Sequence, residues 1–226
     1  MNRTQELLAN LTEVRESIAR ETSREVTLIV VTKTWPASDV TILHDLGVND
    51  VGENRDQEAH AKHDEVAQDD LVWHCIGQVQ TNKARSVAQW ADVVHSVDRL
   101  SLVAALERAS VDRKNPLKVL IQVNLDTPAR EGRGGALPAQ VLELAQEIAK
   151  CDHLELCGVM GVAPLDQDPD PAFAGLQQVS ESLVSQYPQA TWISAGMSQD
   201  YASALKFGAT HLRIGSTVLG HRPAAE

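Results

Sequence analysis

The sequence has few cysteines, no long apolar run and a shortage of basic residues, and each shortage excludes a class of protein. Its three cysteines, Cys75, Cys151 and Cys157, are too few and too scattered for a disulfide framework, and none forms a C-x-x-C pair. We interpret them as small structural hydrophobes in a reducing compartment. No apolar run is long enough to cross a bilayer, so no membrane segment is expected.

Positive charge is scarce, with 20 Lys and Arg against 31 Asp and Glu and a net charge of −11. This balance argues against general binding to nucleic acid or to an anionic membrane, but it leaves room for a local basic pocket that takes a small phosphate. The N-terminal segment MNRTQELLANLTEVRES is polar and lacks the apolar core of a signal peptide. A cytoplasmic location is therefore expected.

Hydrophobic spacing predicts an amphipathic helix over residues 4–21, followed by eight apolar segments that alternate with helical patterns. The predicted strands span residues 26–33, 50–54, 71–77, 92–97, 117–125, 154–162, 191–196 and 211–220. Near-continuous apolar strands separated by helices indicate a parallel sheet that is covered on its outer face. Eight such units favour a single α/β domain over residues 1–226, a closed (β/α)8 TIM barrel, with an open doubly wound sheet as the alternative.

Two long connections, residues 126–138 and 163–171, follow predicted strands and should lie at the same rim of the barrel. The first is rich in Gly and Arg and the second in Asp and Pro, which is typical of surface loops. An alternative for the first connection is a lid in which Arg130 and Arg133 close over an anionic ligand.

The carboxyl ends of barrel strands are where active sites collect, and here these ends carry a lysine and hydroxyl groups. Lys33 ends the first strand, whereas SAGMSQD (194–200) and RIGST (213–217) end the last two. A glycine turn, a helix predicted to open at Ser198, and the hydroxyl of Ser216 would suit a phosphate. A partly desolvated lysine in the same mouth favours Schiff-base chemistry with a phosphosugar or with pyridoxal 5′-phosphate (PLP).

Eight motifs resemble, in the same order, those of the YggS/PROSC family of PLP homeostasis proteins, and the resemblance extends over nearly the whole chain. They are VTKTWP (31–36), GENRDQE (52–58), WHCIGQVQTNK (73–83), HSVD (95–98), VLIQVN (119–124), GVMGVAP (158–164), SAGMSQD (194–200) and RIGSTVLG (213–220). One motif alone would be weak, but eight in order are specific. The resemblance implies a barrel similar to the N-terminal domain of bacterial alanine racemase, the type III fold of PLP proteins.

The resemblance also implies which residues hold the cofactor. Lys33 would carry PLP as a Schiff base, Asn54 would contact the ligand near the ring, and Arg213 would face the pyridine nitrogen. The phosphate would be held by Met197, Ser198, Gly215 and Ser216. An arginine at the pyridine nitrogen keeps its own proton, so it disfavours a protonated ring and weakens PLP as an electron sink.

Three positions depart from the family pattern. Trp35 stands where a second lysine is common, Arg55 where an aromatic residue is common, and Gln78 where histidine is frequent. These departures leave the shape of the ring-side pocket open, whereas the Lys33 and Arg213 positions are kept.

Racemisation would need a second acid/base on the opposite face of the ligand. Alanine racemases take it from a tyrosine in a second domain of the partner subunit, whereas this sequence ends shortly after the eighth strand and has its two tyrosines, Tyr187 and Tyr201, in helical patterns. We therefore expect a monomeric carrier that buffers or delivers PLP with little or no catalysis, with PLP-dependent apoenzymes as candidate recipients. A racemase-like PLP enzyme is the main alternative, and a phosphosugar Schiff-base lyase is the other.

Histidines give weaker predictions. His60 and His63 lie one helical turn apart with Asp64 nearby, but a solvated helix face is favoured over a zinc site, so no metal is expected. His74 lies on a predicted strand, where a hydrogen-bonded core histidine is favoured over a functional one.

Overall fold

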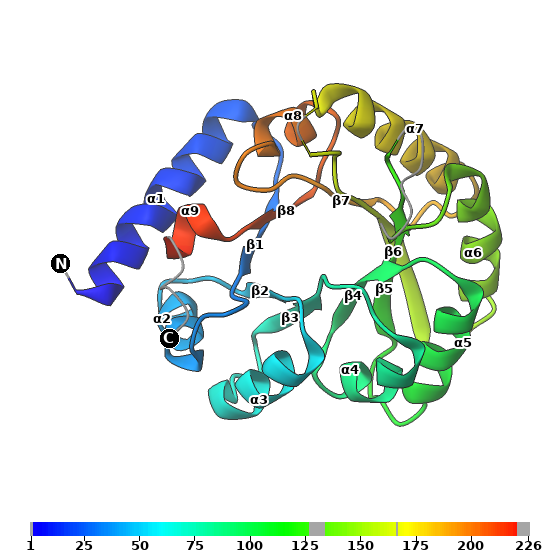
Figure 1. The fold of residues 1–226 in the computed structure, drawn as a ribbon, viewed down its shortest axis with the longest axis horizontal. Coiled ribbons are helices and arrows are strands. Elements are labelled where there is room, and N and C mark those ends of the chain that lie inside the picture. The colour runs from blue at the N-terminus through cyan, green and yellow to red at the C-terminus, as the bar shows by residue number, and fades with distance from the viewer. Residues whose placement is uncertain (1, 127–133, 166, 221–226) are drawn as a thin grey trace.

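The computed structural model describes residues 2–126, 134–165 and 167–220. Eight parallel strands close into a barrel in chain order, and helices surround it on the outside (Figure 1). The strands are β1 (Thr27–Val31), β2 (Asp50–Glu53), β3 (Val72–Cys75), β4 (Val93–Val97), β5 (Leu117–Val123), β6 (Leu154–Gly161), β7 (Trp192–Ser194) and β8 (His211–Ile214). The predicted TIM barrel is confirmed, and β8 closes it by pairing with β1 from Thr27↔His211 to Val30↔Ile214.

Helices follow each strand. They are α2 (Ala37–Asp45), α3 (Asp56–Val66), η1 (Thr81–Lys83), α4 (Ala84–Trp90), α5 (Leu100–Ala109), η2 (Pro138–Gln140), α6 (Val141–Ile148), α7 (Asp170–Gln186), α8 (Tyr201–Lys206) and α9 (Ser216–Leu219). No helix in the described ranges is both long and apolar enough to cross a membrane. The single-domain boundary of 1–226 stays a prediction.

The extra N-terminal helix α1 (Arg3–Glu21) is confirmed, and it lies outside the barrel beside α9 (Figure 1). Asn2 and Gln5 form a capping box, in which the Asn2 side chain accepts from the Gln5 N–H at 2.9 Å. Leu7, Leu11 and Val14 recur at helical spacing and are buried. This face joins α1 to the barrel wall.

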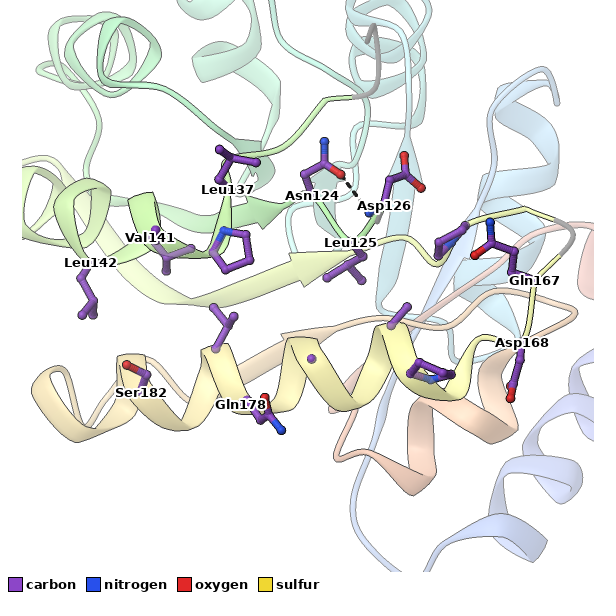
Figure 2. Close-up of a pocket in the computed structure, with 17 residues that line it drawn as sticks. Asn124, Leu125, Asp126, Leu137, Val141, Leu142, Gln167, Asp168, Gln178 and Ser182 are labelled. Atoms are coloured by element: carbon purple, nitrogen blue, oxygen red, sulfur yellow. Dashed lines mark hydrogen bonds between the residues drawn. The ribbon is translucent and has the colours of Figure 1, made fainter. Parts of the chain in front are cut away.

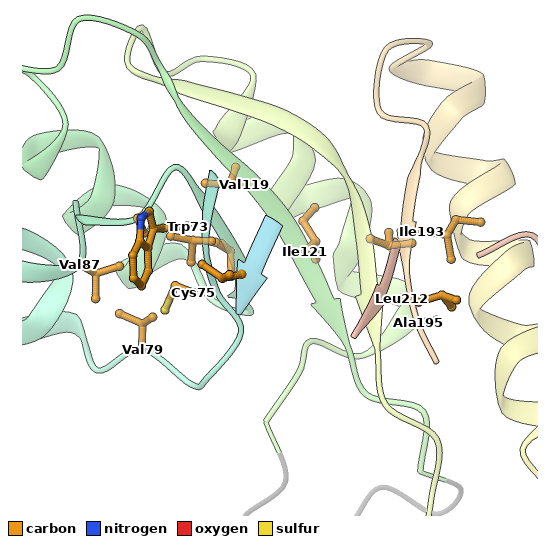
Figure 3. Close-up of a cluster of buried hydrophobic side chains, with 14 of the residues drawn as sticks. Trp73, Cys75, Val79, Val87, Val119, Ile121, Ile193, Ala195 and Leu212 are labelled. Carbon is orange, nitrogen blue, oxygen red and sulfur yellow. The ribbon is translucent and has the colours of Figure 1, made fainter. Parts of the chain in front are cut away.

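Buried apolar side chains form two clusters, because the two faces of each strand meet different surroundings. The larger cluster joins strands to helices, and it includes Trp73 on β3 and Val87 on α4 (Figure 3). The smaller cluster consists of Val93, Leu120, Cys157 and Met160, all from strands β4 to β6. We place this smaller cluster inside the barrel, where strand residues pack against one another.

Two boundaries correct the sequence prediction at the site itself. The eighth strand ends at Ile214 rather than at residue 220, because Gly215 turns the chain and the following residues form the short helix α9. The helix after β7 begins at Tyr201 rather than at Ser198, since the Asp200 carboxylate accepts from the Met197 N–H at 2.6 Å and closes a turn there. The segment Ser216–Leu219 is too short for hydrophobic periodicity to distinguish a strand from a helix.

A substitution at Gly196 can test how tightly the residues after β7 are packed. Its φ is +91°, and an added Cβ would lie 2.8 Å from the Ala204 Cβ and 2.9 Å from the Leu212 Cδ2. Gly196→Ala should therefore lower the free energy of unfolding by about 2 kcal/mol or more, from backbone strain plus overpacking. The control is Gly175→Ala in α7, where nothing lies within 4 Å and alanine should add roughly 0.5–1 kcal/mol. Urea denaturation should shift the two midpoints in opposite directions; a shared direction would contradict this account.

Candidate functional site

Lys33 lies in the turn after β1, two residues beyond Val31, so it does not end the strand as predicted. The side chain is half-buried and lines a cavity of about 760 Å³. The other lining residues include Ile76 after β3 and Ala163 after β6, which places the cavity at the carboxyl end of the barrel. Its volume is in the range of small-molecule sites.

Six of the seven residues predicted for the cofactor line this one cavity: Lys33, Met197, Ser198, Arg213, Gly215 and Ser216. The seventh, Asn54, is exposed just after β2 and is not among the lining residues. Of the three departures from the family pattern, Trp35 lines the cavity, whereas Arg55 and Gln78 do not. The tertiary structure thus brings six of the seven predicted residues together, although the role of each residue stays a prediction.

Two hydroxyl groups meet on one side of the cavity. The Ser216 Oγ at the start of α9 donates to the Ser198 Oγ, 3.2 Å away in the turn before α8. The backbone N–H of Met197 is already engaged with Asp200. The Ser198 and Ser216 hydroxyls are therefore better placed than that N–H to donate to an anion.

Arg213 brings a buried positive charge to the same cavity. Its side chain on β8 is 4% exposed, its Nη1 donates to the Ser194 Oγ at 2.5 Å and its Nη2 donates to the Gly161 carbonyl at 2.9 Å. Burial lowers the pKa of this guanidinium to about 10, so it stays charged at neutral pH. Both acceptors are uncharged, and a polar or anionic ligand atom in the cavity would interact favourably with the charge.

The residues on either side of Lys33, Thr32 and Thr34, are hydrogen-bonded to a group of charged residues that consists of Glu53, Glu58 and Lys62. Lys62 on α3 is 5% exposed and donates to the Glu53 Oε1 at 2.6 Å and to the Thr32 carbonyl at 2.9 Å. The Thr34 N–H donates to the Glu58 carboxylate, and Thr34 has a φ of +70°. A non-glycine residue in this conformation is strained and persists because its surroundings hold it, so the backbone at Lys33 has a defined position.

Sequence reasoning missed this group of charged residues, although one signal was present. Glu58 and Lys62 lie four residues apart on a predicted helix, the spacing of a helical ion pair, and Lys62 also reaches the Glu58 carboxylate at 3.2 Å. The third member, Glu53, is fully buried on β2. Burial raises the pKa of the Glu53 carboxyl, while Lys62 and the Thr32 hydroxyl act in the opposite direction.

The N-terminal helix also reaches the cavity wall. The Arg3 guanidinium lies 4.5 Å from the ring centroid of Trp35, and its Nη2 pairs with the Asp39 carboxylate at 2.6 Å. This cation–π contact positions the Trp35 ring at the cavity.

Other sequence predictions have clear outcomes. His74 is a buried core histidine as predicted, with Nδ1 2.9 Å from the His95 Nε2 and Nε2 2.9 Å from the Asp50 Oδ1. The His60 Nε2 lies 3.6 Å from the Asp64 carboxylate, and the His63 ring packs edge-on against Trp73. Within the described ranges, no group of three or more His, Cys, Asp or Glu residues could hold a metal ion.

The cysteines behave as packed hydrophobes. Burial raises the thiol pKa of Cys75 and Cys157 to about 12 and that of Cys151 to about 11, so little reactive thiolate forms at neutral pH. None of the three is in a disulfide.

The two long connections have different outcomes. Arg130 and Arg133, the predicted lid, lie outside the described residues. The segment 163–171 is more than a surface loop, because Ala163, Pro164 and Leu165 line the Lys33 cavity. A separate cavity of about 890 Å³ lies between the end of β5, α6 and α7 (Figure 2), and it contains none of the seven predicted site residues.

Fold and site together define a barrel of the alanine racemase N-terminal type, with a lysine, two hydroxyls and a buried arginine in one cavity. The model of that family, alanine racemase N-terminal domain, matches residues 3–223. The chain is 38% identical to the pyridoxal phosphate homeostasis protein of Mycobacterium leprae, over 97% of this chain and 94% of that protein. It is 34% identical to the protein of that name from Escherichia coli K12, over 94% and 95% of the two chains. The chain therefore belongs to the pyridoxal phosphate homeostasis protein family.

Solved structures agree with this assignment. PipY of Synechococcus elongatus, whose structure was determined with PLP bound, matches with a TM-score of 0.84 and 31% identity over 95% of this chain and all of that chain. Alanine racemase of Clostridium difficile 630 matches with a TM-score of 0.79 at 15% identity, over 97% of this chain but 58% of that one. The second likeness shows the fold alone.

The Lys62 pair can be tested through stability and its pH dependence. Lys62→Met leaves the buried Glu53 carboxylate without its cation, so the free energy of unfolding should fall by about 3–5 kcal/mol at pH 8. Without Lys62 the pKa of Glu53 rises further, and the folded state then holds a proton that the unfolded state has released. Stability should therefore fall as pH rises from 5 to 8, more steeply than in the parent protein. Urea denaturation at both pH values measures this.

The matched control for that test is Lys62→Met combined with Glu53→Gln, which removes the buried charge as well. The double variant should lose the steep pH dependence between pH 5 and 8. An equal pH dependence in the single and double variants would show that Glu53 is not the group responsible.

Proposed function

We propose that this protein carries PLP as a Schiff base on Lys33 and that it buffers or delivers the cofactor, with little or no catalysis. The observation that supports this most directly is that Lys33, the hydroxyls of Ser198 and Ser216, and the Arg213 guanidinium all line one cavity. The PLP-bound structure of the related PipY is consistent with it.

The residues present fit three of the polar groups of PLP. The Ser198 and Ser216 hydroxyls are donors for the phosphate, the Lys33 amine is the nucleophile, and Arg213 is a donor for the pyridine nitrogen. When bound, PLP supplies an aldehyde carbon that an amine can attack. Arg213 does not release its proton to the ring, because a guanidinium stays charged even where burial lowers its pKa to about 10.

The absence of tyrosine from the cavity supports a carrier over a racemase-like enzyme. Both tyrosines of the chain are among the described residues, and neither Tyr187 nor Tyr201 lines the Lys33 cavity. Asp200 does line it, but the Asp200 carboxylate accepts from the Met197 N–H and closes the turn there. We further propose that the carrier is a monomer and that PLP-dependent apoenzymes receive the cofactor from it.

The covalent site can be tested by incubating the purified protein with PLP and recording its visible spectrum. A yellow adduct should form, and borohydride should fix it on the peptide that contains Lys33. Lys33→Ala should abolish the fixed adduct while leaving weaker, non-covalent PLP binding through the hydroxyls. The control is Lys83→Ala, a change at a 41% exposed lysine outside the cavity, which should not alter the spectrum.

A colourless protein, or a modified peptide that lacks Lys33, would contradict this assignment. Racemase assays with D- and L-amino acids separate the carrier from the alternative enzyme. Turnover by the PLP-loaded protein that disappears in Lys33→Ala would favour the enzyme.

The two hydroxyls can be tested by comparing PLP with pyridoxal, which lacks the phosphate. Ser198→Ala combined with Ser216→Ala should weaken PLP binding about 10²- to 10⁴-fold, because two hydrogen bonds to a charged group are lost and each is worth roughly 1.5–3 kcal/mol. The affinity for pyridoxal should change little. Equilibrium titration by absorbance measures both, and an equal loss for the two ligands would place the phosphate elsewhere.

A further inference from the structure

Five polar side chains from five strands form one continuous hydrogen-bonded chain through the barrel. In order these residues are Asp50 (β2), His74 (β3), His95 (β4), Ser194 (β7) and Arg213 (β8). The Asp50 Oδ1 lies 2.9 Å from the His74 Nε2, and the His74 Nδ1 lies 2.9 Å from the His95 Nε2. The His95 Nδ1 lies 2.9 Å from the Ser194 Oγ, which is 2.5 Å from the Arg213 Nη1. Because β4 and β7 are not neighbours in the barrel, the His95–Ser194 contact must cross its interior.

The two ends of this chain lie in different cavities. Arg213 lines the Lys33 cavity at the carboxyl ends of the strands. Asp50, at the start of β2, and His74 line a separate cavity of about 780 Å³, together with Thr27 at the start of β1. This hydrogen-bonded chain of side chains therefore connects the amino-end face of the barrel to the candidate ligand site.

With both histidines neutral, hydrogen-bond chemistry allows one consistent direction along this hydrogen-bonded chain. Arg213 can only donate, so the Ser194 Oγ accepts from it and turns its own hydrogen to the His95 Nδ1. His95, with Nδ1 accepting, then carries its proton on Nε2 and donates to the His74 Nδ1. By the same reasoning His74 carries its proton on Nε2 and donates to the Asp50 carboxylate.

Electrostatics agree with a neutral His95 inside the barrel. His95 is fully buried, and burial, His74 and Arg213 together hold its pKa well below the usual range. In the opposite arrangement of protons with neutral histidines, an unprotonated His74 Nε2 would face the Asp50 carboxylate, with two acceptors 2.9 Å apart. The arrangement that begins at Arg213 satisfies every member, which a buried polar network requires.

The polar residues of this hydrogen-bonded chain also differ from the residues that usually fill a barrel. Barrel interiors are filled mainly by branched apolar side chains, as Val93 and Leu120 illustrate here. In this interior, His74, His95, Ser194 and Arg213 are each at most 4% exposed. Such a network is costly if any member loses its partner, so its integrity depends on Asp50, the terminal acceptor.

We infer that Asp50, His74, His95 and Ser194 are positioning residues that orient the Arg213 guanidinium toward the ligand, with Asp50 acting from the opposite end of the barrel. The Ser194 Oγ and the Gly161 carbonyl restrain the two Nη atoms, so the guanidinium cannot rotate away from the cavity. The identity of the ligand rests on the proposed function, whereas the direction of the chain does not.

The direction is tested without ligand, by NMR of the ¹⁵N-labelled histidine rings at neutral pH. His74 and His95 should both be neutral, with the proton on Nε2 and an unprotonated Nδ1. In Asp50→Ala, His74 loses its acceptor and its signals should shift toward a mixture of tautomers. A proton on Nδ1 of either histidine in the parent protein would overturn the inference.

The positioning role is tested by titration with PLP. Asp50→Ala should weaken PLP binding about 10-fold, although Asp50 lies at the other end of the barrel. Asp50→Asn keeps an oxygen acceptor for His74 and should restore the affinity to within about threefold of the parent. The control is Asp112→Ala, which removes an exposed carboxylate that lines the same amino-end cavity but lies outside the chain, and it should bind PLP as the parent does.

The outcomes separate the two proposals. If the parent protein takes up no PLP, the proposed function fails, while the NMR result still decides the direction of the chain. If the parent binds PLP and the Asp50→Ala and Asp112→Ala variants bind it equally well, the positioning role fails and the proposed function stands. If Asp50→Ala does not fold, the histidine tautomers of the parent protein and the PLP affinity of Asp50→Asn test the positioning role instead. Weak PLP binding by Asp50→Asn, together with histidines protonated on Nε2, would overturn that role.

Discussion

A guanidinium buried inside a barrel imposes a strict requirement, since its charge is retained and each of its donors needs an acceptor. Arg213 meets this requirement with the Ser194 hydroxyl, the Gly161 carbonyl and the cavity beside it. Ser194 can accept from Arg213 because its own hydrogen has a partner in His95, which in turn depends on His74 and Asp50. One buried charge thus explains why this line of polar residues crosses the barrel interior.

The part of the cavity wall around Lys33 is built differently. Lys33 is placed by its neighbours in the chain, Thr32 and Thr34, which are tied to Lys62 and Glu58 behind the strand. These ion-paired groups lie between the barrel wall and α3, whereas the Arg213 chain lies inside the barrel. Two separate polar groups therefore hold the two basic side chains of the candidate site, so a change in one group should leave the other in place.

Much of the fold and of the candidate site could be predicted from the sequence. The alternation of apolar strands and helices indicated the closed barrel, and the motifs at the strand ends indicated six residues that line one cavity. Element ends were less predictable, because the short apolar run 216–219 fits a strand as well as the helix it forms. Asn54 was assigned to the site by resemblance alone, and it lies exposed outside the cavity lining.

By itself the sequence determined the alternation of strands and helices, the family, and the presence of a lysine and hydroxyls near strand ends, because these follow from local pattern and order along the chain. Tertiary structure alone decided that Asp50, His74, His95, Ser194 and Arg213 form a single chain. These residues lie far apart in the sequence, and each one alone looks like an isolated polar residue in a strand. Closure of the barrel brings their strands around one interior, and only there do their donors and acceptors meet.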